Sequence, residues 1–98
     1  MAMLHIIRSS AFTSNALKQC LSMCFSDDSI LLMDDGCYNL NHALLLEAQV
    51  KQSAKRVYFI GFHASARAQK NTNDTFTAIT LTEVIALLFQ YDNSITWS

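Results

Sequence analysis

The 98-residue sequence contains no proline, only two glycines and no excess of charge of either sign. With Gly36 and Gly61 as its only glycines, it cannot form the glycine-rich loops that bind nucleotides. Seven basic residues against eight acidic ones leave a formal net charge of -1, and the Lys and Arg residues are scattered. This pattern excludes the basic patch expected of a nucleic-acid-binding protein.

Long apolar runs are also missing, since none approaches the roughly 20 residues that a membrane span needs. The first apolar run precedes Arg8 and no small-residue cleavage site follows, so we expect no signal peptide. The three cysteines are an odd number, which excludes a full set of internal disulfides. We therefore expect a cytoplasmic protein with reduced cysteines.

About half of the residues are apolar, enough for a hydrophobic core. The length predicts one domain, residues 1–98. A domain of this size buries a limited fraction of its surface, so a partner subunit would stabilise it.

Apolar runs and helical periodicities alternate along the chain. The predicted strands are Leu4–Ile7, Ile30–Met33, Val57–Ile60, Phe76–Leu81 and Ile95–Trp97. The predicted helices are Phe12–Phe25, Leu40–Val50, Ala64–Lys70 and Thr82–Tyr91, the last capped by Thr82. This alternation predicts an α/β three-layer sandwich of right-handed βαβ units, with a mostly parallel sheet of about five strands and helices on both faces.

Ligands of such a sheet bind outside the carboxyl ends of its strands. In this chain that rim is predicted at Arg8–Ser10, Asp34–Cys37, Gly61–His63 and Thr82. A Cys37 thiol beside a His63 imidazole could be activated as a thiolate. The alternative is that Cys37 is a small loop residue and His63 a solvent-exposed loop histidine. Asp34 and Asp35 are typical of a turn, and His5 of a core or edge histidine.

Cys20 and Cys24 lie four residues apart and share one face of the first predicted helix. Buried cysteines commonly act as small hydrophobic residues, so both are candidates for the core. No third or fourth metal ligand is evident nearby, which argues against a metal site. Cys20 lies about 12 Å along the helix from Phe12. A reactive Cys20 would therefore work at a side or lower surface, at a subunit interface.

The segments MLHIIRSSAF, NALKQCL, LLMDDGCY, the residues around Ala66-Arg67 and the ending ITWS resemble the TusB/DsrH family. The resemblance covers nearly the whole chain, in the same order and spacing. It implies a DsrE-like fold with a parallel sheet. Three positions depart from the family pattern: Ser10 replaces a proline, Ala68 a glycine and Cys37 an apolar residue.

The resemblance also implies the smallest subunit of a sulfur-relay complex. In the TusBCD branch, three related subunits form a trimer that pairs into a heterohexamer and passes persulfide sulfur toward 2-thiolation of the wobble uridine of tRNA. In the DsrEFH branch a similar complex serves sulfur oxidation. The principal sulfur-carrying cysteine belongs to a sister subunit, although some DsrH-type members carry one at the position of Cys20. The implied partners are sisters resembling TusC and TusD, or DsrF and DsrE, and a downstream sulfur-acceptor protein, with no cofactor or metal.

We predict an accessory subunit of a cytoplasmic sulfur-relay complex for tRNA thiolation, which binds neither nucleic acid nor membrane itself and self-associates when isolated. One alternative is a DsrH-type subunit whose Cys20 is the catalytic, persulfide-carrying residue. Its thiolate would take the outer sulfur of a donor persulfide and yield it to an acceptor thiol. The other alternative is a small-molecule binding module that uses the rim with Cys37 and His63.

Overall fold

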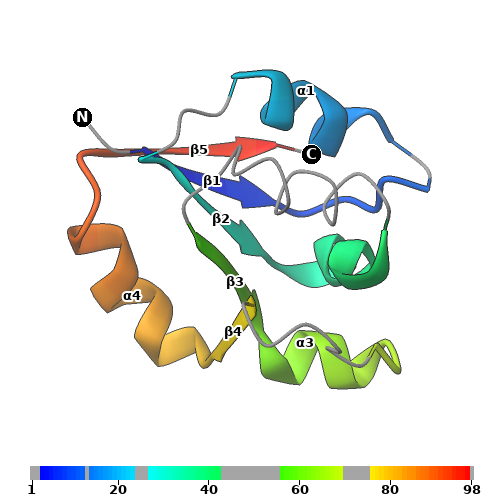
Figure 1. Ribbon diagram of the computed structural model, residues 1–98. Coiled ribbons are helices and arrows are strands. Elements are labelled where there is room, and N and C mark those ends of the chain that lie inside the picture. The colour runs from blue at the N-terminus through cyan, green and yellow to red at the C-terminus, as the bar shows by residue number, and fades with distance from the viewer. Residues whose placement is uncertain (1–2, 13, 24–26, 43–55, 70–75, 98) are drawn as a thin grey trace.

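The computed structural model describes residues 3–12, 14–23, 27–42, 56–69 and 76–97 (Figure 1). Its strands are β1 (Met3–Ile7), β2 (Ser29–Leu32), β3 (Arg56–Ile60), β4 (Phe76–Ile79) and β5 (Asn93–Trp97). They form one parallel sheet in the order β4-β3-β2-β1-β5. The prediction of an α/β fold with a parallel five-stranded sheet is therefore confirmed.

The first and last strands of the sequence are neighbours in this sheet. Met3 of β1 is paired with Asn93 of β5, and Ile7 with Trp97. Strands β1 to β4 follow one another across the sheet, and the chain then returns from β4 to the far edge. Because crossovers between parallel strands are right-handed, this reversal places the last helix on the opposite face from the earlier ones.

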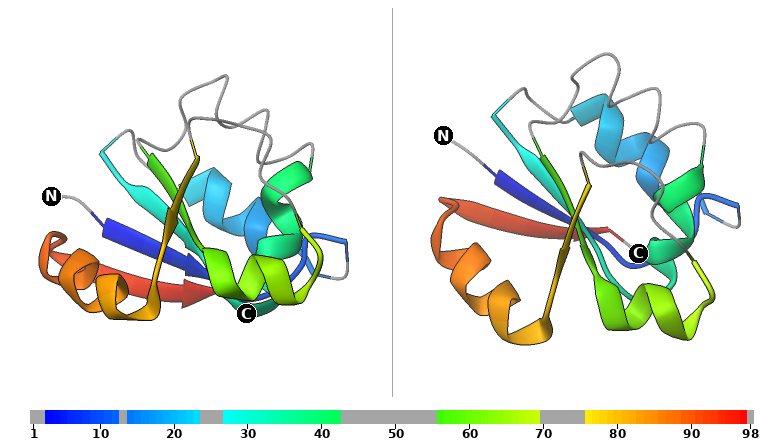
Figure 2. Two further views of the ribbon diagram at one scale, coloured as in Figure 1. Left: turned by 90° about the horizontal axis from the view of Figure 1, so that it is seen from below. Right: turned by 60° about the horizontal axis from the view of Figure 1, so that its bottom comes forward.

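Two hydrophobic cores cover the two faces of the sheet. The first face packs against α1 (Ala16–Met23), the 3-10 helix η1 (Asp34–Asn41) and α3 (Gly61–Ala66). The second face packs against α4 (Leu81–Phe89), which Figures 1 and 2 show apart from the other helices. All four residues of β2 are buried, and three of them belong to the unbroken apolar run that predicts a strand covered on both sides.

The first helix begins later than predicted. It begins at Ala16, whose N–H donates to the Ser14 hydroxyl (3.1 Å). Phe12 precedes the helix and is exposed, with its ring edge-on to His42 at 4.6 Å between centroids. The prediction that the helix begins at Phe12 is therefore wrong, because three polar residues separate Phe12 from the first helical residue.

The last helix begins one residue earlier than predicted, and its cap is Thr80. The Thr80 hydroxyl accepts the N–H of Glu83 (3.2 Å), and the Glu83 carboxylate accepts the N–H of Thr80 (3.0 Å). This reciprocal pair is a capping box. Thr82, the predicted cap and rim residue, lies inside the first turn instead.

The segment after β2 is a 3-10 helix where the sequence analysis predicted a turn. Gly36 is required at this point, because a Cβ there would clash with the carbonyl oxygen of Ile7 and lie 2.8 Å from its carbon. The close approach lets η1 close the carboxyl end of β1, where Met33 N–H donates to Ile7 O (3.0 Å). Leu40, predicted to begin the second helix, belongs to η1, and residues 43–50 of that prediction lie outside the described residues.

Candidate functional site

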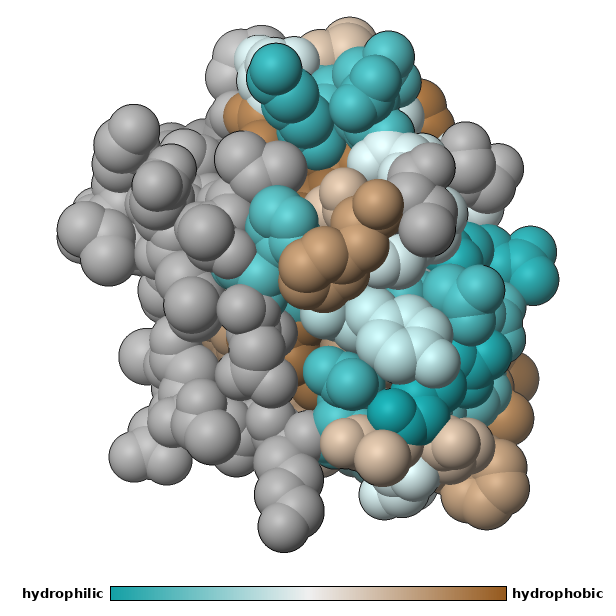
Figure 3. Space-filling model, turned by 90° about the vertical axis from the view of Figure 1, so that its right-hand side faces the viewer, coloured by the Kyte–Doolittle hydropathy of each residue, from teal (hydrophilic) through white to brown (hydrophobic). Residues whose placement is uncertain are grey.

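Charged side chains meet at the carboxyl ends of β1, β2 and β3, on the rim that the sequence analysis selected. Figure 3 views this side of the molecule, where hydrophilic residues cover much of the described surface beside a smaller apolar group. The Arg8 guanidinium contacts the Asp34 carboxylate, with both Nε and Nη2 at 2.9 Å from Oδ2. Both side chains are partly exposed, so this ion pair contributes about 0–1 kcal/mol to stability.

His63 is fixed by the backbone of the same rim. Its Nδ1 accepts the N–H of Asp34 (3.0 Å), whose backbone adopts the left-handed region at φ 49°. A neutral His63 ring therefore carries its proton on Nε2, since Nδ1 is the acceptor. The histidine is mostly buried in α3 rather than exposed on a loop, which corrects the alternative that we considered for it.

Arg67 completes the rim from the end of α3. Its Nε donates to Asp35 (2.9 Å) and its Nη1 to the carbonyl oxygen of His63 (3.2 Å). The hydrogen bond that Arg67 donates to Asp35 raises the pKa of Arg67. Arg67 belongs to a segment that resembles the family, but nothing in the sequence indicates Asp35 as its partner. On this rim two guanidinium groups are matched by two carboxylates, so the charges largely neutralise one another.

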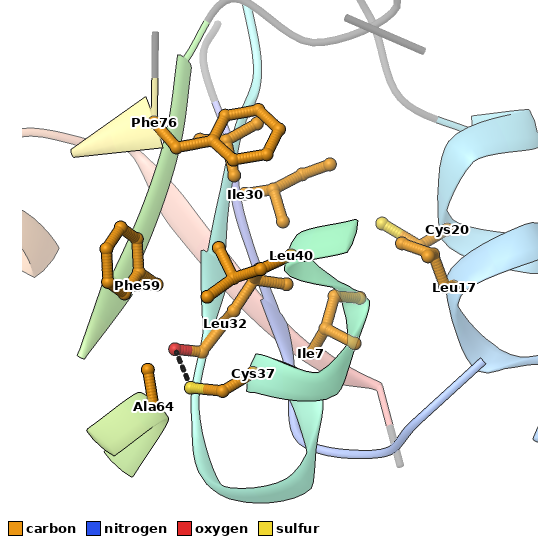
Figure 4. Close-up of a cluster of buried hydrophobic side chains, with 11 residues drawn as sticks. Ile7, Leu17, Cys20, Ile30, Leu32, Cys37, Leu40, Phe59, Ala64 and Phe76 are labelled. Carbon is orange, nitrogen blue, oxygen red and sulfur yellow. Dashed lines mark hydrogen bonds between the residues drawn. The ribbon is translucent and has the colours of Figure 1, made fainter. Parts of the chain in front are cut away.

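Cys37 lies in the hydrophobic core beneath this rim. The side chain is fully buried, and its Sγ donates to the carbonyl oxygens of Leu32 (3.7 Å) and Ile60 (3.9 Å), the first drawn in Figure 4. Burial is the main cause that raises the Cys37 pKa from 9.0 to about 11. The activation of Cys37 by His63, one of the two alternatives considered, is not found, since His63 Nδ1 is bonded to Asp34 and Cys37 Sγ to carbonyl oxygens.

Cys20 is also fully buried, on the same face of the sheet. Figure 4 shows its side chain and that of Leu17 directed from α1 into the core. Cys24, its predicted companion, lies outside the described residues. Because a sulfur-carrying thiolate must reach its donor, Cys20 in this conformation becomes reactive only if α1 moves.

A polar network is buried at the other end of the sheet. His5 Nε2 lies 2.9 Å from the Asp28 carboxylate, and its Nδ1 accepts the indole N–H of Trp97 (3.1 Å). Asp28 also accepts the N–H of Met3 (3.0 Å). The prediction that His5 is a satisfied core histidine is confirmed. Nothing in the local sequence around Asp28 indicates a partner 23 residues away.

Among the residues that the structure describes, no group of three or more His, Cys, Asp or Glu side chains is placed to hold a metal ion. Within the same ranges, no helix has the length and apolar character needed to cross a bilayer.

Comparison with solved structures identifies the class of fold. YchN from E. coli superposes with a TM-score of 0.73 at 18% identity, over 98% of this chain and 99% of its own. Protein Tm0979 from Thermotoga maritima superposes with a TM-score of 0.65 at 23% identity, over 92% and 93% of the two chains. These identities are low, so the likeness establishes a shared α/β fold. None of the curated proteins compared with the chain matches it significantly.

The family follows from the sequence itself. The model of the DsrH-like proteins matches residues 9–94, which is most of the chain. The protein belongs to the DsrH-like family. Membership makes it a sulfur-relay subunit, as the resemblance implied, and members of this family form complexes with sister subunits.

Proposed function

We propose that this chain is an accessory subunit of a cytoplasmic sulfur-relay complex that passes persulfide sulfur toward 2-thiolation of the wobble uridine of tRNA. Its sister subunits resemble TusC and TusD and assemble with it into a heterohexamer. The complex delivers sulfur to a downstream acceptor protein, and this chain does not contact nucleic acid. When isolated from its sisters, the chain self-associates.

The burial of both described thiols is the observation that supports an accessory role. Sulfur transfer needs an accessible thiolate with a lowered pKa. Cys37 has the opposite properties, a buried side chain and a pKa raised to about 11. Cys20 is buried as well, so the transferring thiol is expected on a sister subunit.

Mass spectrometry after incubation with a persulfide donor tests this proposal. The purified chain is treated alone and together with its sister subunits, and peptides are mapped for a gain of one sulfur. We expect the sulfur on a sister subunit and none on Cys20 or Cys37. Sulfur mapped to this chain in the assembled complex would refute the accessory role.

A second candidate function is that of a DsrH-type sulfur carrier that uses Cys20. It is supported by the position of Cys20 on α1, a helix of eight residues that buries only three of them. A short helix with so little buried surface can open locally at a small free-energy cost. In this case Cys20→Ser abolishes sulfur uptake by the complex while Cys37→Ser does not, and unchanged uptake in Cys20→Ser excludes the carrier.

A further inference from the structure

The outer side of α4 is apolar and exposed. The helix buries Val84 and Leu87 on the sheet. On its other side Leu81, Ile85 and Phe89 are 55%, 61% and 87% exposed. These three residues are spaced by four, so they form one continuous row along the helix. A helix that is apolar on both sides is typical of one that is buried, which indicates that another protein surface covers this row.

Phe62, in the first turn of α3, is a further exposed apolar residue close to the start of α4. The register pairs Ile60 of β3 with Ile79 of β4, so Phe62 and Leu81, two residues further on, lie at adjacent strand ends. Phe62 is 79% exposed. In Figure 2, α3 and α4 start from these neighbouring ends and then run to different sides of the sheet. We call Phe62, Leu81, Ile85, Leu88 and Phe89 the α4 ridge.

The size of the α4 ridge fits a protein–protein contact. At about 150–250 Å² per aromatic side chain, the exposed parts of Phe62 and Phe89 alone amount to roughly 250–400 Å². Each partner of a standard interface buries about 800 Å², and its core is apolar with a polar rim. Two phenylalanines therefore supply up to about half of one side, before the three aliphatic residues are counted.

We propose that the α4 ridge joins two copies of this chain around a two-fold axis that passes near Ile85. In such a contact the helices run antiparallel, so that Ile85 meets its own copy and Leu81 meets Phe89 of the other copy. Rows spaced by four interdigitate at a crossing angle of about -50°, the commonest packing of two helices. Both subunits then use the same surface, as a two-fold interface requires.

The charges beside the α4 ridge favour this arrangement. Glu83 lies in the first turn of α4. At the other end, the exposed Arg56 lies near Tyr91, two residues beyond the helix. Arg56 also donates a hydrogen bond to Tyr58, which raises the pKa of Arg56. An antiparallel pairing brings Glu83 of each copy toward Arg56 of the other. The α4 ridge is less suited to a lipid surface than to a second copy of the chain, because Leu81–Phe89 contains no Lys or Arg.

Light scattering on the isolated chain, from micromolar to hundreds of micromolar, tests the contact. We expect wild type to approach twice its 11.0 kDa mass. Ile85→Glu should remain monomeric, because two like charges would meet on the axis. Met23→Glu is the matched control, since Met23 on α1 is also 61% exposed, and it should dimerise like wild type.

The two-fold arrangement is tested by exchanging charges. Arg56→Glu and Glu83→Arg should each weaken self-association, whereas an equimolar mixture of the two variants restores both oppositely charged contacts. We expect the mixture to associate at least tenfold more tightly than either variant alone, with circular dichroism confirming that both are folded. A mixture no tighter than its components overturns the two-fold axis.

A wild-type chain that is monomeric throughout, or an Ile85→Glu variant that still dimerises, overturns the contact. Association that needs a sister subunit would assign the α4 ridge to that sister and also overturn it. The inference places the self-association proposed above on the α4 ridge and does not rest on sulfur transfer. A monomeric chain would overturn both the inference and that self-association, whereas the accessory role in sulfur transfer is tested separately by persulfide mapping.

Discussion

Replacing Cys37 by alanine distinguishes a core thiol from a reactive one through the pH dependence of stability. The folded chain holds this thiol with a pKa of about 11, against 9.0 as its ordinary value. A group whose pKa is raised on folding keeps its proton in the folded state after the unfolded state has lost it. Its contribution to stability is therefore complete below pH 9 and is lost as pH rises from 9 to 11.

The size of this loss follows from the two pKa values. A shift of two pKa units corresponds to about 2.7 kcal/mol in full. At pH 8 the thiol is protonated in both states and the loss is close to zero. At pH 10 the unfolded thiol is mostly ionised and the folded one mostly not, which lowers the free energy of unfolding by about 1.4 kcal/mol.

The assay is urea denaturation of wild type and Cys37→Ala at pH 8 and pH 10, under reducing conditions and followed by Trp97 fluorescence. Removing the side chain leaves a small cavity, but its cost is the same at both pH values and cancels in the comparison. Tyr91, whose pKa burial also raises, is present in both proteins and cancels too. We expect wild type to lose about 1.4 kcal/mol relative to the variant between the two pH values.

A relative change near zero would refute the argument that burial controls this thiol. A change of opposite sign would show that the Cys37 pKa is lowered on folding, as in a reactive cysteine, and would return Cys37 to the candidate site.

The two glycines should respond differently to the same substitution. Gly36→Ala places a methyl group against the backbone of Ile7 and should lower the free energy of unfolding by about 3 kcal/mol, because a backbone cannot turn aside as a side chain can. Gly61→Ala meets only ordinary contacts in a helix and should be neutral or stabilising by up to about 1 kcal/mol. If thermal denaturation showed equal losses of stability in the two variants, the close approach of Gly36 to Ile7 would be contradicted. Thr80→Ala removes a helix cap and should cost about 1 kcal/mol, whereas Thr82→Ala should change stability by less than about 0.5 kcal/mol. A larger effect at Thr82 would assign the cap there.

The strands could be predicted because their apolar residues lie in short unbroken runs. A strand covered on both faces, such as β2, can be recognised from its own apolar residues, without knowing which strands pair with it. The cap of α4 could also have been found, because Thr80 and Glu83 have the Thr-x-x-Glu spacing of a capping box. Thr82 is the predicted cap only because the apolar run of the preceding strand continues to Leu81 in the sequence.

The candidate site was less predictable, because its chemistry depends on contacts between distant segments. The rim was located correctly from topology, but the burial of Cys37 depends on the 3-10 helix that carries it. This 3-10 helix, η1, has no apolar periodicity by which it could be predicted. Its position depends on its packing against the end of β1. In the same way, the contacts that Asp28 makes in the core come from His5 and Met3, which lie more than 20 residues away in the sequence.

The pairing of β1 with β5 has a consequence for the order in which the protein folds during synthesis. β1 is made first and β5 last, and 90 residues separate the paired Met3 and Asn93. Until residue 97 has left the ribosome, one edge of β1 carries unpaired backbone groups beside an almost wholly buried strand. Such an edge readily pairs with other chains, so a nascent or truncated chain without β5 is an aggregation-prone species that chaperones would have to protect.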